Sequence, residues 1–186
     1  MVISIYLQDP VVHLASALGL GLLMGAAALH KLQVGQAFSR VLDDYATALG
    51  VALPLWLRSV LGRLLPWLEM AAAIGLLMSV WVPWAALGAA ILIALYAVVL
   101  AVSVARGAII EDCGCNFGSK HQALSGALVW RNVLLLLPVL NLMTPMHDRP
   151  LVWLDAVTLG FVLPSIAALY ILTNLLISNR VSLRAL

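Results

Sequence analysis

Two cysteines, Cys113 and Cys115, are the residues of this chain best suited to redox chemistry. They are the only cysteines in its 186 residues, and a single glycine separates them. A disulfide needs Cα atoms about 4.4–6.8 Å apart and a side-chain torsion near 90°, so a ring closed across one residue forms only with strain. A strained, accessible disulfide is readily reduced and exchanged. The pair therefore predicts a site of thiol–disulfide exchange.

The segment around the cysteines is predicted to be a polar redox loop, residues 107–122, between two helices. Arg106 and Gly107 form a basic last turn followed by a helix-terminating glycine. Ser119, with Gln122 three residues later, has the capping-box pattern that opens a helix. The loop is thus expected to lie at the ends of two helices that fix its position.

The charges in this loop predict that Cys115 is the more acidic thiol. It lies four residues before the expected helix start, where the positive helix end, Lys120 and His121 favour a thiolate. The two acidic residues that precede Cys113 act in the opposite direction on that thiol.

Two other interpretations of the cysteine pair stay open. Buried, inert cysteines are common in membrane helices, although this pair lies in a polar stretch. The two thiolates and His121 could hold a soft metal ion, although two sulfurs on so short a tether rarely complete a tetrahedral shell. We therefore predict exchange chemistry and no metal site.

The composition predicts an integral membrane protein of the all-α class. Hydrophobic residues make up 64% of the chain, charged residues 10%, and the mean hydropathy is +1.09, which excludes a soluble globular domain. The net charge of +2 and the absence of a basic cluster give no indication of nucleic-acid binding. We expect a single integral membrane domain, residues 1–186.

Five segments are long and apolar enough to cross a bilayer, which takes about 20 residues per helix. They are residues 11–29, 64–81, 84–105, 123–143 and 152–177. The second and third are joined only by Val82 and Pro83 between two tryptophans, which predicts a tight hairpin at an aromatic belt. Because the first ten residues contain no lysine or arginine, we expect no cleaved signal peptide.

An amphipathic helix is predicted between the first two spans. Its apolar residues recur at helical spacing, and polar residues fill the other side; the apolar residues are Phe38, Val41, Leu42, Tyr45 and Leu49. The helix could lie on the membrane surface or be an ordinary packed loop helix.

Charged residues within the predicted spans are candidates for the interior of the bundle. Glu69 lies in the second span, and Arg131, followed by Asn132, lies in the fourth. Both helices enter the membrane from the same face, which places Glu69 and Arg131 at similar depths of about 10–15 Å. Unpaired charges at such depth cost several kcal/mol, so we predict a Glu69–Arg131 ion pair that fixes helix register or relays protons. His30, at the end of the first span, is predicted to be an interfacial anchor or to line the cysteine site.

The basic residues are distributed unequally between the two faces. Nine of the ten lysines and arginines fall on or near the face that carries the cysteine loop and the C-terminus, and only Arg149 lies opposite. The positive-inside rule then predicts a periplasmic N-terminus and a cytoplasmic cysteine loop and C-terminus.

One series of residues between about Leu20 and Leu140 resembles the MauE family of methylamine utilisation proteins, which is related to DoxX-like membrane proteins. The series is His30-Lys31, Phe38, Asp44-Tyr45, Pro54, Leu65-Pro66, Glu69, Gly75, Arg106-Gly107, Asp112-Cys113-Gly114-Cys115, Phe117-Gly118 and Arg131-Asn132. The cysteine element followed by Arg-Asn is its most specific part. Asn116 is a departure, because the family often has Cys-Phe-Gly without an intervening residue.

The resemblance implies a bacterial inner-membrane protein that assists maturation of methylamine dehydrogenase, a periplasmic quinoprotein whose small subunit carries many disulfides. It also implies a thioredoxin-like partner of the MauD type, with which Cys113 and Cys115 would exchange disulfides. The bundle is similar in outline to vitamin K epoxide reductase, which passes electrons to a quinone, but no quinone site is recognisable in the sequence. A periplasmic client and a cytoplasmic loop would together require redox equivalents to cross the membrane.

Three functions are compatible with these observations. The first is a redox-active accessory protein of the thiol–disulfide oxidoreductase type. The second is a non-redox membrane scaffold or chaperone for the partner. The third is a soft-metal transporter, which is disfavoured because the methionines form no stripe along a helix.

Overall fold

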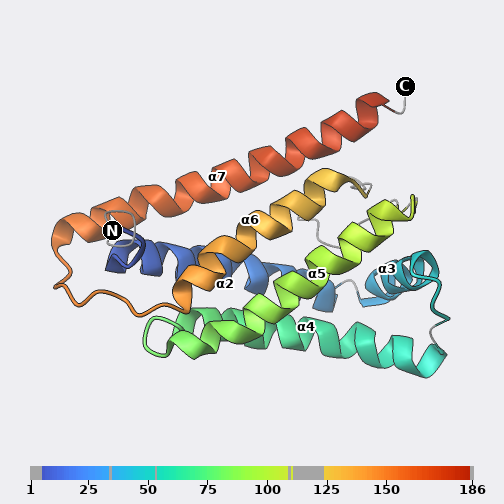
Figure 1. The fold of residues 1–186 in the computed structure, drawn as a ribbon, viewed down its shortest axis with the longest axis horizontal. Coiled ribbons are helices and arrows are strands. Elements are labelled where there is room, and N and C mark those ends of the chain that lie inside the picture. The colour runs from blue at the N-terminus through green and yellow to red at the C-terminus, as the bar shows by residue number, and fades with distance from the viewer. Residues whose placement is uncertain (1–5, 34, 53, 109, 111–123, 185–186) are drawn as a thin grey trace.

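A computed structural model of the chain describes residues 6–33, 35–52, 54–108, 110 and 124–184. The elements, in order, are α2 (Pro10–Gln33), α3 (Gly35–Ala48), α4 (Leu55–Met78), the 3-10 helix η1 (Pro83–Ala86), α5 (Leu87–Ala105), α6 (Gly126–Leu142) and α7 (Trp153–Arg184). The described residues contain no strand, so the predicted all-α class is confirmed (Figure 1).

Four segments are long and apolar enough to cross a membrane, which makes this a multi-pass membrane protein. They are Pro10–Gln33, Leu55–Met78, Pro83–Ala105 and Trp153–Ile177, whereas α6 is an apolar helix of only 17 residues. At 1.5 Å per residue α6 is about 25 Å long, a little short of a 30 Å hydrocarbon core. The fourth predicted span is therefore present but shorter than expected.

The helix that contains the second predicted span begins nine positions earlier than predicted, at Leu55 instead of Leu64. Pro54, in extended conformation, precedes its first residue, as is usual at a helix start. The tight hairpin between α4 and η1 is confirmed: the amide of Val82 donates to the carbonyl of Met78 at 3.0 Å. Trp81 and Trp84 are exposed on either side of it.

α2 lies at the centre of the bundle and packs against α4, α6 and α7, while α5 packs against α6 (Figure 1). Small residues let these helices approach closely, as is usual between membrane helices. The closest approach is at Gly75, where an added Cβ would lie 2.5 Å from the carbonyl oxygen of Ala85. Leu76, Val139 and Leu142 are fully buried in the resulting core.

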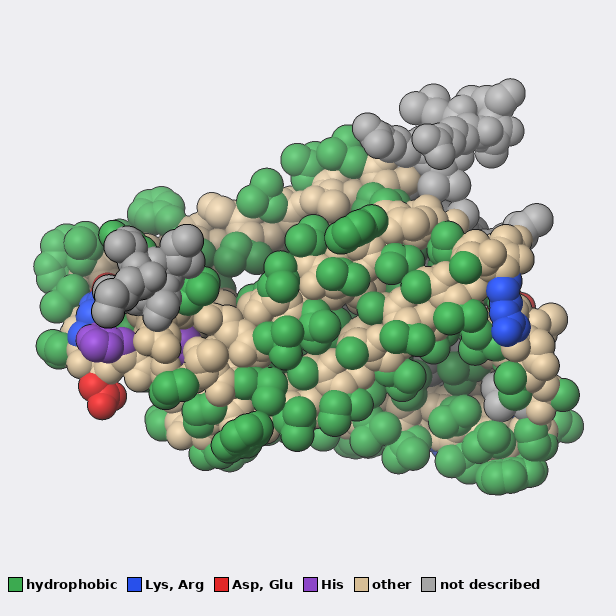
Figure 2. Space-filling model, in the orientation of Figure 1, with side chains coloured by type: hydrophobic (Ala, Val, Ile, Leu, Met, Phe, Trp, Pro, Cys, Tyr) green, Lys and Arg blue, Asp and Glu red, His purple; other side chains and the backbone are tan. Residues whose placement is uncertain are grey.

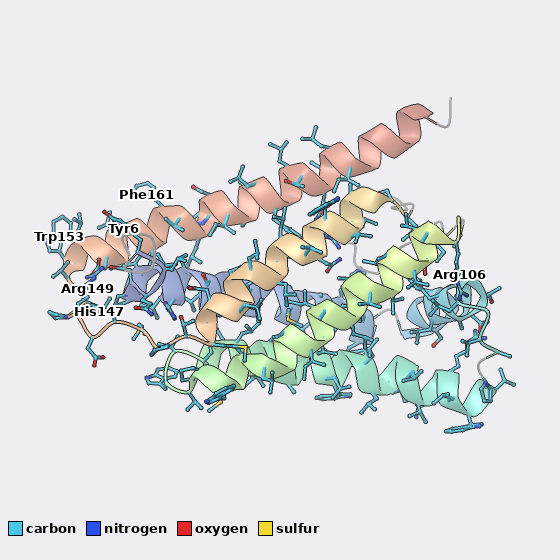
Figure 3. All side chains as sticks on the ribbon, viewed as in Figure 1. Tyr6, Arg106, His147, Arg149, Trp153 and Phe161 are labelled. Atoms are coloured by element: carbon cyan, nitrogen blue, oxygen red, sulfur yellow. The ribbon has the colours of Figure 1, made fainter. Side chains whose placement is uncertain are left out.

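Hydrophobic and charged side chains occupy different parts of the surface. Figure 2 shows hydrophobic side chains across the middle of the visible face, with charged side chains at both ends and histidine side chains towards the left end. Arg106 and Arg149 lie at opposite ends of the bundle (Figure 3). This segregation matches the predicted assignment of basic residues to two faces.

Three residues, Asp9, Arg149 and Asp155, form a charged cluster at one end that we call the clamp. Arg149 donates to the carboxylate of Asp9 at 2.9 and 3.1 Å and to that of Asp155 at 2.8 and 3.0 Å. These hydrogen bonds hold the pKa of Asp9 below its usual value. Asp9 precedes α2 and Asp155 belongs to α7, so the clamp joins the first of these helices to the last.

Candidate functional site

The end of α5, where the chain enters the cysteine segment, lies at the opposite end of the bundle from the clamp (Figure 3). Four of the predicted site residues lie outside the described residues, namely Cys113, Cys115, Ser119 and His121. The structure does describe the points at which the chain leaves α5 and enters α6, and the side chains buried in the helices that meet there.

The chain leaves α5 through a Schellman motif at the predicted glycine. Gly107 has a φ of +67°. Its amide donates to the carbonyl of Val104 at 3.0 Å, and the amide of Ala108 donates to the carbonyl of Ser103 at 3.1 Å. This pair of bonds satisfies the last carbonyls of the helix and needs a residue that tolerates positive φ. The predicted helix end at Arg106 and Gly107 is confirmed.

A backbone hydrogen bond then brings the two ends of the cysteine segment together. The amide of Leu124 donates to the carbonyl of Ile110 at 3.0 Å, and Ile110 is only 3% exposed. The segment that contains both thiols therefore begins and ends at one point of the bundle.

α6 begins later than predicted. Ser125 is its N-cap residue, with extended φ and ψ of −148° and 155°, and Gly126 is its first residue. Since residues 124 and 125 are not helical, Ser119 is not the N-cap of this helix, and that prediction is wrong. The argument that the start of this helix favours a thiolate at Cys115 loses its basis, because the helix starts eleven positions beyond that residue.

The predicted Glu69–Arg131 ion pair is also wrong, because Glu69 pairs with Lys31. Oε1 of Glu69 accepts hydrogen bonds from the ammonium of Lys31 and from the hydroxyl of Tyr96. The Lys31 ammonium also lies 5.2 Å from the centre of the Tyr96 ring. Glu69 is 2% exposed, and its Oε2 has no hydrogen-bond partner among the described residues.

Lys31 was missed because the first span was expected to end at Leu29, whereas α2 continues to Gln33. Its buried residues recur three or four positions apart, from Ala17 through Leu20, Met24 and Ala28 to Lys31. Extending that stripe by one step would have placed Lys31 inside the bundle. His30, the neighbouring predicted residue, is half-buried on another side of α2.

Arg131 and Asn132 are buried in α6, as expected of polar residues within a span. Nη1 of Arg131 donates to Oδ1 of Asn174 at 2.9 Å, and its guanidinium lies 5.8 Å from the centre of the Tyr170 ring. Nδ2 of Asn132 donates to the carbonyl of Leu128 at 3.0 Å. Two partners of Arg131, Asn174 and Tyr170, are thus in α7, a helix in which no site residue was predicted.

The Lys31–Glu69–Tyr96 cluster borders a cavity of about 300 Å³ under the amphipathic helix α3. Apart from Lys31, Tyr45 and Tyr96 its walls are aliphatic side chains of α3, α4, α5 and the segment that follows α3. Arg106 reaches the end of α3, where its Nη1 donates to the carbonyl of Ala48 at 3.4 Å. The end of α5 that leads into the cysteine segment is therefore in contact with the helix that covers this cavity.

The sequence pattern of the family described as Methylamine utilisation protein MauE matches residues 9–144. The chain belongs to the MauE family. The match runs from the clamp residue Asp9 through α6, so it includes the cysteine segment and the buried residues Lys31, Glu69 and Arg131 but not α7. The resemblance read from the sequence is thereby confirmed.

Relatives named methylamine utilization protein MauE resemble much of the chain. The protein of Methylorubrum extorquens is 33% identical over 173 residues, which cover 93% of this chain and 90% of the relative. That of Paracoccus denitrificans is 36% identical over 70% of this chain and 67% of its own length. That of Methylophilus methylotrophus is 38% identical over 58% of this chain and 54% of its own. No solved structure gives a significant match.

Proposed function

We propose that this membrane protein acts in methylamine utilisation as a thiol–disulfide exchange component through Cys113 and Cys115. The observation that carries the proposal is the hydrogen bond between Leu124 and Ile110, because the segment between them holds the only two cysteines of the chain. A tethered segment at helix ends presents two thiols to a partner without requiring the bundle to open.

The partner that suits this chemistry is a thioredoxin-like protein of the MauD type. A thiolate of the pair attacks the partner's disulfide to form a mixed disulfide and releases one partner thiol. The second cysteine then attacks the mixed disulfide, which leaves a Cys113–Cys115 disulfide and a fully reduced partner. The same steps in reverse oxidise the partner, so the exchange serves either direction of electron flow.

The client is the small subunit of methylamine dehydrogenase, which receives its disulfides directly or through the thioredoxin-like protein. The membrane is the bacterial inner membrane. The charge distribution favours a cytoplasmic cysteine segment and a periplasmic N-terminus, and with a periplasmic client the protein would move redox equivalents across the bilayer. A C-terminal fusion to an enzyme that is active only in the periplasm tests this orientation: activity would contradict it.

Replacing each cysteine separately tests the exchange chemistry. Cys113→Ser and Cys115→Ser are each expected to abolish maturation of the client, and one of them is expected to accumulate a mixed disulfide with the partner. If the double variant supports normal client assembly at normal membrane levels, the protein is a non-redox scaffold and the proposal fails.

A further inference from the structure

A cavity of about 490 Å³ lies between α2, α6 and α7, separate from the cavity under α3. It runs along α2 from Ala15 to Ala26 and along α7 from Leu163 to Leu175, a length of about 16–18 Å at 1.5 Å per residue. Its walls are aliphatic for most of this length, with Ser16 towards the clamp end and Tyr170 and Asn174 towards the other. Both long walls belong to helices that are long and apolar enough to cross a membrane, so the cavity suits a molecule that dissolves in the bilayer.

The end near Asn174 offers hydrogen-bond donors next to a positive charge. Asn174 is 8% exposed, and its Oδ1 is occupied by Arg131. No described residue accepts a hydrogen bond from Nδ2 of Asn174 or from the hydroxyl of Tyr170. An amide and a phenol can each donate to a ligand oxygen, and the Arg131 guanidinium behind them stabilises negative charge on that oxygen.

We propose that this cavity binds an isoprenoid quinone, with its ring at Tyr170 and Asn174 and its chain between α2 and α7. A quinone supplies carbonyl acceptors at one end and a single apolar chain at the other, which matches a narrow apolar cavity with donors at one end. A phospholipid carries two chains and a larger charged head, so it matches the cavity less well. The family match ends at residue 144, so the α7 half of this site lies outside the pattern that defines the family.

The role of the quinone rests on the proposed function, although its binding does not. Oxidation of two thiols to a disulfide breaks two S–H bonds, forms one S–S bond and releases two electrons and two protons. The quinone accepts both electrons and both protons and becomes a quinol, which diffuses away in the membrane. The bound quinone is in that case the electron acceptor for the Cys113/Cys115 pair.

Binding is tested on the full-length protein in detergent, with decylubiquinone as the probe and quenching of tryptophan fluorescence as the measurement. Wild type is expected to bind saturably. Asn174→Leu, which removes one donor, is expected to raise Kd about 3- to 10-fold. Gly19→Leu, at a cavity-lining glycine whose Cβ position has only Leu163 within 4 Å, fills the cavity and is expected to raise Kd by about 10-fold or more.

Gly88→Leu is the matched control, because Gly88 is exposed in α5, lines neither cavity and has nothing within 4 Å of its Cβ position. It is expected to bind as wild type does. The proposal fails if Gly19→Leu and Gly88→Leu bind equally. It also fails if 1-decanol or phosphatidylglycerol displaces the probe as well as unlabelled ubiquinone does, since the cavity would then recognise only an apolar chain.

The double Cys113→Ser, Cys115→Ser variant separates this proposal from the exchange function. It is expected to bind decylubiquinone with wild-type Kd, since the contacts proposed for the quinone come from α2, α6 and α7. Normal client maturation in Gly19→Leu, despite its weakened quinone binding, would leave the site in place and refute only the coupling between site and thiols.

Discussion

Removing the ammonium of Lys31 is expected to destabilise the bundle strongly. In Lys31→Met the carboxylate of Glu69, which is 2% exposed, keeps only the hydroxyl of Tyr96 as a partner. Breaking a buried ion pair by removing one member costs about 3–5 kcal/mol. For a chain of this size that corresponds to a fall in the unfolding midpoint of about 6–20 °C.

A double-mutant cycle then separates the ion pair from its surroundings. Glu69→Gln combined with Lys31→Met removes both charges and leaves an amide oxygen that accepts the hydrogen bond from Tyr96. The double variant is expected to lie within about 1–2 kcal/mol of wild type, so it should be more stable than Lys31→Met by about 1–4 kcal/mol, and Glu69→Gln alone completes the cycle that gives the coupling energy. Unfolding is followed by tryptophan fluorescence in mixed micelles with increasing dodecyl sulfate.

The ion pair between Arg58 and Asp43 provides the matched control. Its atoms are 2.5 Å apart, but its side chains are 26% and 46% exposed, and solvent-exposed pairs contribute about 0–1 kcal/mol. Arg58→Met should therefore cost no more than about 1 kcal/mol. The assignment of Lys31 and Glu69 as a buried pair is refuted if Lys31→Met costs no more than Arg58→Met, or if the double variant is as unstable as the single one.

Two further changes test the packing and the clamp. In Gly75→Ala the new Cβ would meet the Ala85 carbonyl at 2.5 Å, so α4 and η1 must separate, at a cost of about 1–3 kcal/mol; Gly88→Ala, which meets nothing within 4 Å, should unfold as wild type does. Arg149→Met should lower the unfolding midpoint at pH 7. The hydrogen bond from Arg149 lowers the pKa of Asp9 in the folded protein. The stabilisation that this bond gives to the fold is therefore present above the usual aspartate pKa, near pH 4, and is lost as the pH falls through the lower pKa of Asp9 in the folded protein. The difference between wild type and Arg149→Met should therefore narrow between pH 7 and pH 3, and a constant difference would show that the clamp does not depend on ionised Asp9.

Features set by local sequence were predictable. The order of the helices follows from the lengths of apolar runs, the hairpin from Val82 and Pro83, and the end of α5 from Gly107, whose positive φ few other residues tolerate. Each of these depends on residues within one or two turns of the feature, so no tertiary information is needed to place them.

The exact ends of the helices, and the rotation of each helix about its axis, could not be predicted from local sequence. α4 begins nine positions early because arginines that interrupt the apolar run, Arg58 and Arg63, are accommodated near its start, where Arg58 reaches Asp43 in α3. The length of α2 decides whether Lys31 lies outside the bundle or inside it. The choice of Lys31 over Arg131 as the partner of Glu69 depends on how α2, α4 and α6 are rotated about their axes, which a hydropathy pattern does not specify.

The clamp has a consequence for how the protein is made. Asp9 is made before α2, whereas Arg149 and Asp155 are made only after α6, so translation must pass all of these helices before the carboxylate of Asp9 gains its cation. A chain that stalls in the ribosome before Arg149 keeps an unneutralised acid at the start of its first long helix. Closure of the clamp thus waits until the helices from α2 to α6 have been made, and a product truncated before Arg149 would carry on Asp9 a negative charge that the clamp neutralises.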